Sequence, residues 1–156
     1  MRLLVQRVLE AAVTVDGQTT GAIGKGLLVM TGFGDEDGPD FHHSPVFEGM
    51  ARKLLDLRIF PGEGDRCDKF DRSARDHGTD VLLVPQFTLY ADTSSRRPGF
   101  TGAAKPDAAI PLYERFMAHC RERGFDVQHG EFGADMQVDS RNDGPVTILF
   151  DTERPL

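Results

Sequence analysis

The chain has 156 residues, of which 39% are hydrophobic and 28% charged, as in one ordinary globular domain rather than a disordered or fibrous chain. The net charge of −7 argues against broad binding to a nucleic-acid backbone, DNA included, because such binding needs many Lys and Arg side chains. A small footprint on one end of an RNA remains compatible with it. The longest apolar runs hold four residues, far short of the roughly 20 of a membrane helix, so a cytoplasmic protein without membrane contact is expected.

The first 33 residues predict three antiparallel strands. Alternating apolar residues run from Leu3 to the turn dipeptide Asp16-Gly17, and a second strand follows over 18–23. After a Gly-containing turn, the apolar run from Leu27 to Phe33 predicts a buried strand.

The middle of the chain predicts a helix, a loop and a central strand. Apolar residues at spacings of three and four favour a helix over Val46 to Leu57, with Pro45 in its first turn. Residues 61 to 80 are polar and rich in Gly and Asp, and we expect an irregular loop there. Val81 to Val84 is apolar on both faces, as in a strand covered on both sides.

A second helix is predicted near residue 107. Asp107 suits its N-cap, Pro111 its first turn and Gly124 its end. The remaining strands are expected around 126–130, 136–140 and 145–150. The pattern indicates an α+β fold in which residues 1–156 form a single domain, with a mostly antiparallel sheet or barrel and two main helices.

The usual catalytic residues are almost absent. The histidines show no metal-ligand spacing, and there is no G-x-S-x-G motif. Cys120 lies on the predicted buried stripe of the second helix, which favours an inert thiol over a nucleophile. We therefore expect no metal or cofactor, and any hydrolysis must depend on positioning, backbone dipoles and groups of the substrate.

Two stretches stand out, PQFTLY at 85–90 and NDGPVT at 142–147. Polar Gln86 and Thr88 follow a buried strand that stops at Pro85, which fits either the edge of a cleft or a simple strand end. The bond before Pro145 could be cis, as about 5–6% of X–Pro bonds are, but the residues alone favour a hairpin turn. Arg96-Arg97 and Lys105 lie in the polar, Gly-containing stretch after PQFTLY, and they fit either a local RNA-binding patch or a solvated loop.

Together these stretches resemble the D-aminoacyl-tRNA deacylases, the D-tyrosyl-tRNA deacylase family. The likeness runs nearly end to end, and its motifs are VQRVLEAAVTVDG, GAIGKGLLVMTG, LRIF, QFTLYAD, RRPGFTGAAKPDAAIPLYERF, GEFGADMQV and NDGPVT. It implies a homodimer, with active sites at the subunit interface, that binds the aminoacyl-tRNA acceptor end. The implied reaction hydrolyses the ester bond of D-aminoacyl-tRNA, and of glycyl-tRNA mischarged on tRNA-Ala.

The resemblance also implies roles for individual residues. Gly144-Pro145 would be a cis dipeptide, inserted into the partner's pocket, that rejects L-aminoacyl groups. Arg7 would steady it, Met136 would form a pocket wall, and the site would be lined by Gln86, Phe87 and Thr88. Thr88 has no base placed to activate it as a nucleophile, so we expect the 2′-OH of the terminal ribose to help activate water.

The chain departs from the family pattern at two places. Pro85 stands where the family usually has serine, which removes a hydroxyl and a backbone N–H. The loop 67–78 also differs from the usual segment. Besides a working chiral deacylase, two alternatives therefore remain open: a relaxed deacylase of small L-aminoacyl-tRNA, and a non-catalytic dimeric RNA-binding module.

Overall fold

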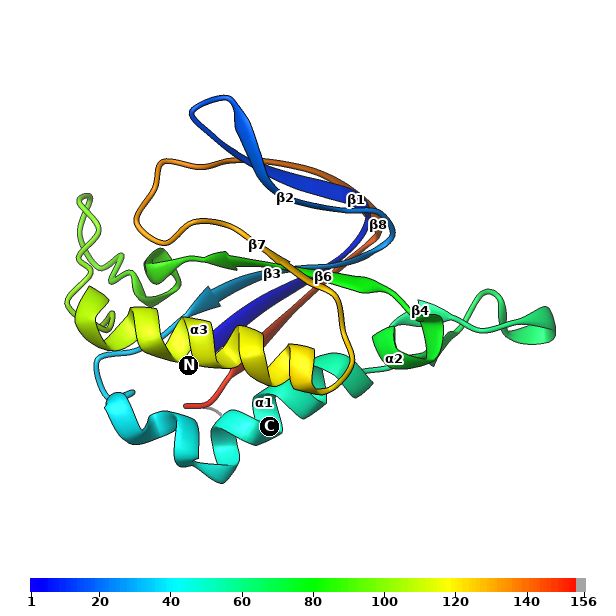
Figure 1. Ribbon diagram of the computed structural model, residues 1–156, viewed down its shortest axis with the longest axis horizontal. Helices are drawn as coiled ribbons and strands as arrows, with labels where there is room; N and C mark the ends of the chain where they lie inside the picture. Colours follow the sequence, from blue (N-terminus) through cyan, green and yellow to red (C-terminus); the bar gives the residue numbers. More distant parts are fainter. Residues whose placement is uncertain (154–156) are drawn as a thin grey trace.

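The computed structural model describes residues 1–153 (Figure 1). Its sheet is organised around one long strand, β1 (Arg2–Val15). The first half of β1 pairs with β3 (Gly26–Gly32), its second half pairs with β2 (Gln18–Ile23), and β8 (Gln137–Asp151) runs antiparallel along the whole strand. The predicted three-strand start of the chain is confirmed.

Two further strands extend the sheet beyond β3. β6 (Asp80–Pro85) pairs parallel to β3, and β7 (Val127–His129) pairs parallel to β6. Contacts between β2 and β7 bring the two sides of the sheet together, so that it is nearly closed. The mostly antiparallel α+β fold is confirmed, with β6 and β7 as its parallel part.

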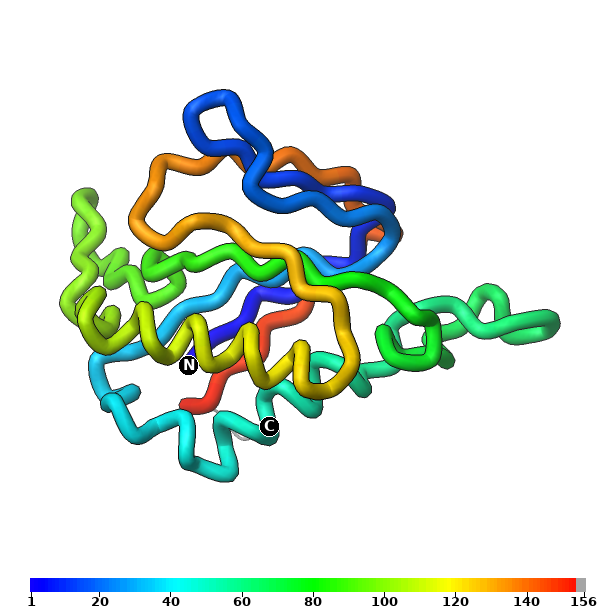
Figure 2. Tube along the Cα trace, viewed as in Figure 1, coloured from blue at the N-terminus to red at the C-terminus, as the bar shows by residue number. Residues whose placement is uncertain are grey.

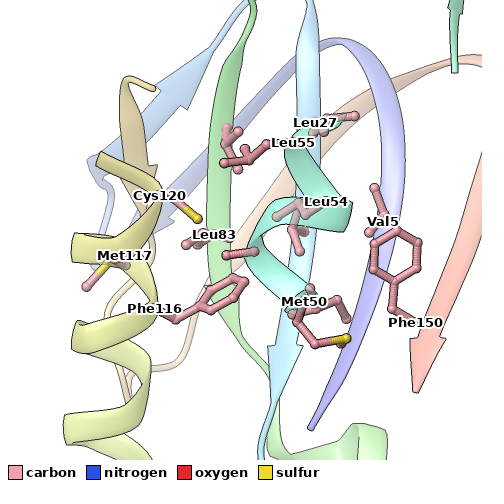
Figure 3. Packing of buried hydrophobic residues seen from close by; sticks show 14 of the residues in the cluster. Val5, Leu27, Met50, Leu54, Leu55, Leu83, Phe116, Met117, Cys120 and Phe150 are labelled. Carbon is pink, nitrogen blue, oxygen red and sulfur yellow. The ribbon is translucent and has the colours of Figure 1, made fainter. Parts of the chain in front are cut away.

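The two main helices cover one face of the sheet (Figure 1). They are α1 (Pro45–Asp56) and α3 (Pro106–Glu122). Leu54 of α1, Phe116 of α3 and Leu83 of β6 are all fully buried between the layers (Figure 3). None of the helices within residues 1–153 is long and apolar enough to span a membrane.

The helix boundaries partly correct the sequence prediction. For α1 the shift is one residue, and Ser44 is the N-cap because its hydroxyl accepts a hydrogen bond from Phe47 N at 3.2 Å. For α3, Asp107 is not the N-cap: the helix begins at Pro106, with the Lys105 carbonyl accepting the first helical bonds. Pro111 therefore lies inside the helix, on an exposed position. Its missing N–H cannot bond the carbonyl of Asp107, which is an exposed residue.

The prediction of an irregular loop over 61–80 is wrong in part. It contains β4 (Phe60–Pro61), a short 3-10 helix η2 (Gly64–Arg66), β5 (Phe70–Arg72) and α2 (Ala74–His77). The arm contains exposed ion pairs, including Arg72 to Glu63 at 2.6 Å, and a capping box of Ser73 and Asp76, while Phe60 and Ala74 anchor it in the core. Such polar contacts leave no hydrophobic periodicity to read.

The prediction of a hairpin turn at Gly144-Pro145 is also wrong. The two strands expected over 136–140 and 145–150 are one strand, β8, and the dipeptide lies within it. β1 offers hydrogen bonds along both of its halves, so β8 stays paired and absorbs the extra residues as register shifts opposite Gln6 to Glu10. The Gly144-Pro145 bond is cis.

Candidate functional site

A cavity of about 340 Å³ lies at the carboxyl end of β6. It is enclosed by the end of β6, the start of α3 and the turn before β8; the lining residues are Val84, Pro85, Gln86, Phe87, Pro106, Phe132, Gly133, Ala134, Met136 and Val138. Figure 2 shows the green segment after β6 and the orange turn before β8 at one end of the molecule. The cavity thus brings together four residues that the sequence singled out: Pro85, Gln86, Phe87 and Met136.

The segment after β6 turns at once into a short 3-10 helix, η3 (Phe87–Tyr90). Gln86 N donates to Thr31 O at 2.8 Å, which fixes the start of the turn against β3. A Cβ on Gly32 would lie 2.8 Å from Gln86 O, so only glycine permits this approach. The Gln86 side-chain amide donates to the Thr88 hydroxyl. Thr88 is therefore oriented by an amide and not by a base.

The cavity contains no charged group of its own. Among the described residues that line it, none has an ionisable side chain. The N-terminus of α3, which carries a partial positive charge, begins at the lining residue Pro106. Lys105 precedes that residue and is exposed, as are Arg96 and Arg97. Such a site can orient an uncharged group through hydrogen bonds and attract phosphates at its rim.

An exposed aromatic pair lies beside the cavity. The rings of Phe87 and Phe100 meet edge to face with centroids 5.1 Å apart. Phe87 is 53% exposed and Phe100 38% exposed. Large aromatic groups with free faces can stack on nucleobases.

Of the other predicted site residues, Thr88 lies on η3 outside the cavity lining, whereas Arg7, Gly144 and Pro145 form a second cluster. Arg7 is buried; its Nε lies 3.1 Å from the Asp143 carboxylate, and its guanidinium donates to Ile59 O. The guanidinium also lies over the Phe70 ring, 5.7 Å from its centroid. A Cβ on Gly144 would lie 3.3 Å from Arg7 Nη2. Arg7 therefore packs directly beside the Gly144-Pro145 dipeptide.

The two clusters do not meet within one chain. Pro85 pairs with Thr31 on β3, whereas Arg7 pairs with Leu27 on the same strand. Four residues of extended chain correspond to roughly 13 Å along the strand direction. Within residues 1–153, the cavity lining includes neither Arg7 nor Gly144-Pro145.

Sequence reasoning did not identify two walls of the cavity. Phe132 and its neighbours come from the GEFGADMQV stretch, in which the sequence predicts only Met136 as a pocket wall. Pro106 was placed outside the second helix, whereas it begins that helix at the cavity. Cys120 is buried, which confirms its predicted place on the core face of the helix, and burial raises the pKa of its thiol to about 12.

Comparison with known proteins gives a consistent result. The family model described as D-Tyr-tRNA(Tyr) deacylase matches residues 4–151. A D-aminoacyl-tRNA deacylase of Desulfovibrio desulfuricans is 54% identical over 154 residues, covering 97% of this chain and 96% of that protein. One of Bacillus licheniformis is 47% identical over 154 residues, covering 98% and 99%.

Two solved structures share the fold. The c-Myc DNA Unwinding Element Binding Protein has a TM-score of 0.86 and 37% identity, covering 97% of this chain and 99% of its own. A probable eukaryotic D-amino acid tRNA deacylase has a TM-score of 0.75 over 96% of this chain and 97% of its own. At 21% identity the second likeness supports the fold alone.

Proposed function

The chain belongs to the D-Tyr-tRNA(Tyr) deacylase family and is a hydrolase of D-aminoacyl-tRNA; from this premise we propose that it is a cytoplasmic homodimer. It also hydrolyses glycyl-tRNA mischarged on tRNA-Ala, and it rejects L-aminoacyl groups at Gly144-Pro145. The observation that carries the proposal is the uncharged cavity that unites Pro85, Gln86, Phe87 and Met136. It accepts an aminoacyl ester without supplying an acid or a base.

The hydrolytic step depends on the substrate's own groups. An aminoacyl ester is already labile, so water needs placement and the developing oxyanion needs hydrogen-bond donors. The terminal ribose 2′-OH helps to activate that water. Gln86 and Thr88, joined by their hydrogen bond, position the ester and the ribose. The lack of an ionisable side chain in the described lining supports this division of roles.

The chiral screen belongs to the partner subunit. Gly144 and Pro145 are exposed in the single chain and lie far from that chain's own cavity. In the homodimer the dipeptide enters the other subunit's cavity, where the side chain of an L-amino acid would clash with it. The hydrogen of glycine and the side chain of a D-amino acid avoid that clash. Arg7 holds the dipeptide through its packing beside Asp143 and Gly144.

The mechanism is tested with Thr88→Ala and with a substrate ending in 2′-deoxyadenosine. We expect Thr88→Ala to keep turnover within about 10-fold of the parent, because a positioning hydroxyl is worth about one hydrogen bond. The 2′-deoxy substrate should not react. A trapped acyl-Thr88 ester would contradict the mechanism, as would normal hydrolysis of the 2′-deoxy substrate.

A second candidate function is favoured by Pro85, which lines the cavity in place of the family's usual serine. This is relaxed chirality, with hydrolysis of small L-aminoacyl-tRNA. Deacylation of D-Tyr-, Gly-, L-Tyr- and L-Ala-tRNA by the parent and by Pro85→Ser separates the two. We expect cleavage of the first two substrates only. If the parent cleaves L-Ala-tRNA and Pro85→Ser does not, the hypothesis of relaxed chirality is correct.

A further inference from the structure

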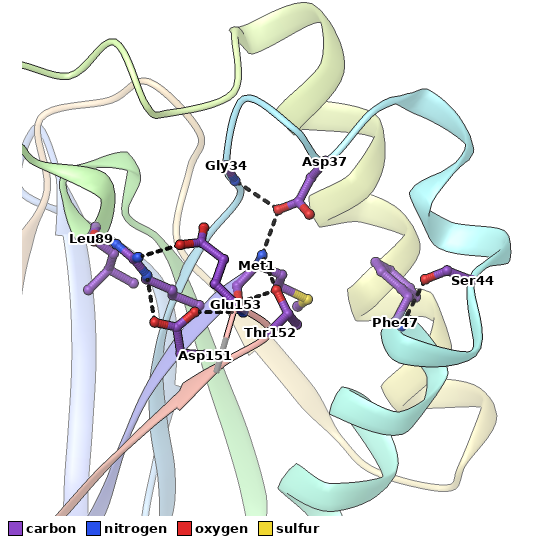
Figure 4. Close-up of polar contacts among 10 residues, drawn as sticks. Met1, Gly34, Asp37, Ser44, Phe47, Leu89, Asp151, Thr152 and Glu153 are labelled. Carbon is purple, nitrogen blue, oxygen red and sulfur yellow. Dashed lines mark hydrogen bonds and ion pairs between the residues drawn. The ribbon is translucent and has the colours of Figure 1, made fainter. Parts of the chain in front are cut away.

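Arg2 makes a set of contacts that joins three distant parts of the chain. Its Nε donates to the Asp151 carboxylate at 3.1 Å, and its Nη2 donates to Glu153 at 3.0 Å. Its Nη1 donates to the backbone carbonyl of Leu89 at 2.9 Å. Figure 4 shows Leu89, Asp151 and Glu153 gathered around these contacts.

The Leu89 carbonyl belongs to η3, the segment that carries Phe87 and Thr88. Arg2 also lies over the ring of Tyr90, with Cζ 4.3 Å from the ring centroid. That ring is buried. One guanidinium therefore contacts the last two residues of η3, Leu89 and Tyr90. The hydrogen bond from Gln86 N to Thr31 O fixes the start of η3 on β3.

We propose that Arg2 is a positioning residue for deacylation: it holds η3 so that Phe87 keeps its place in the cavity lining and Thr88 its place beside the Gln86 amide. This inference rests on the proposed function of that cavity. Arg2 lies outside the cavity and contacts no lining residue's side chain through these bonds. Its effect reaches the substrate only through the backbone of η3.

Arginine suits this role because one planar group serves three acceptors. A guanidinium offers five N–H donors in a rigid fork and a flat face for stacking. Arg2 uses three nitrogens on three acceptors while its plane covers Tyr90. A lysine at this position could keep the charge beside Asp151, but it could not also hold Leu89 in the same geometry.

The first variant is Arg2→Met, which keeps an unbranched stem over Tyr90 and removes every donor. With D-Tyr-tRNA as substrate, we expect kcat to fall about 10-fold while KM stays within about 2-fold, because η3 loses its placement but the binding surface remains. Hydrogen exchange over residues 86–92 should accelerate about 10-fold, and outside the two chain ends that Arg2 joins, 1–4 and 149–153, other segments should be unchanged.

The matched control is Glu153→Gln, which weakens one ion pair of the same guanidinium and leaves the Leu89 bond intact. Its kcat and its exchange over 86–92 should equal those of the parent. Arg2→Lys is the second variant, which keeps a cation beside Asp151 if Arg2→Met folds poorly. It should show an intermediate kcat, and added guanidinium ion should raise the turnover of Arg2→Met.

Several results would overturn the inference. These are an unchanged kcat in both Arg2 variants, a loss of kcat with faster exchange throughout the protein, and a loss of kcat equal to that of Glu153→Gln. If the parent itself hydrolyses no D-aminoacyl-tRNA, the proposed function fails. The exchange measurement then decides the role of Arg2 alone: unchanged exchange over 86–92 in Arg2→Met overturns it, and a local acceleration supports it.

Discussion

At the scale of single residues, two glycines show how closely the backbone segments of the site approach their neighbours. Gly32 leaves room for the Gln86 carbonyl, so η3 can sit on the end of β3. Gly144 has φ +122°, a conformation that residues with a Cβ rarely adopt, and a Cβ there would lie 2.9 Å from Val146 Cγ2. Both positions therefore depend on the absence of a side chain.

Gly144→Ala should lower the free energy of unfolding by about 1–3 kcal/mol, because the methyl group is strained by both φ and contact. Gly24→Ala is the matched control, since nothing lies within 4 Å of its Cβ position. That change should stay within about 0.5 kcal/mol. Urea denaturation of the two variants measures both values, and equal midpoints would contradict the expectation.

At the scale of elements, α1 is held by its buried stripe more than by its caps. Leu54 is fully buried against β-sheet and α3 residues, whereas Val46 on the same helix is 44% exposed. Leu54→Ala should therefore cost about 2–5 kcal/mol of unfolding free energy, from lost transfer energy and the cavity left behind. Val46→Ala should cost less than about 1 kcal/mol. Thermal and denaturant unfolding of both variants would test this difference, and equal losses would mean that α1 contributes little through its core face.

The elements that could be predicted from the sequence are those with a hydrophobic period. α1, α3 and the strands of the first 33 residues have such a period, and the structure confirms them. The arm over 61–80 is mostly polar and exposed, as is the middle of β8, so neither offers a period to read. β8 is continuous because β1 pairs with it over its whole length, and that is information from another part of the chain.

The candidate site also has some parts that could be predicted from the sequence and others that could not. Polar Gln86 and Thr88 after a buried strand leave open whether this is a cleft edge or a simple strand end, and the family resemblance selects the first; Pro85, Gln86 and Phe87 do line a cavity. The wall at Phe132 and the helix start at Pro106 could not be predicted, because the chain returns to the cavity from distant positions. Arg2 is the extreme case: its partners Leu89 and Asp151 lie 87 and 149 residues away, and no local pattern marks it.

At the scale of the whole molecule, an acidic protein must bind an acidic substrate. The net charge is −7, so the attraction has to be local, and Arg96 and Arg97 lie exposed in the segment that follows η3. The double change Arg96→Ala/Arg97→Ala should raise KM for D-Tyr-tRNA about 10-fold with little change in kcat. Two lost phosphate contacts on a single strand should reduce the slope of log KM against log salt by about 1.4.

The control for this pair removes the same charge elsewhere. Arg52 and Arg115 are exposed on α1 and α3, and the double change Arg52→Ala/Arg115→Ala should leave KM within about 2-fold. If both double variants raise KM equally, the attraction depends on total charge and not on a patch beside the cavity.

The cavity and the cluster of Arg7 with Gly144-Pro145 lie apart in one chain, which leads to a prediction about the homodimer. If the cavity of one subunit works with Gly144-Pro145 of the other, then defects in the two clusters can be separated between subunits. Gln86→Ala removes the amide that positions the ester, and Gly144→Val adds a branched side chain where the dipeptide enters the partner's cavity, so that it also obstructs a D-aminoacyl group. Each homodimer should therefore lose most of its activity on D-Tyr-tRNA. In their heterodimer, one site combines an intact cavity with an intact dipeptide.

An equal mixture of the two variants, exchanged through mild denaturation, should therefore recover about a quarter of the parent activity: half of the dimers are mixed, and each has one intact site. Gln86→Ala mixed with Met136→Arg is the control, because both defects lie in the cavity and no dimer regains an intact one. Light scattering should show the parent as a dimer throughout. A monomeric active parent, or the same recovery in both mixtures, would contradict a site shared between subunits and would require Gly144-Pro145 to act within its own chain.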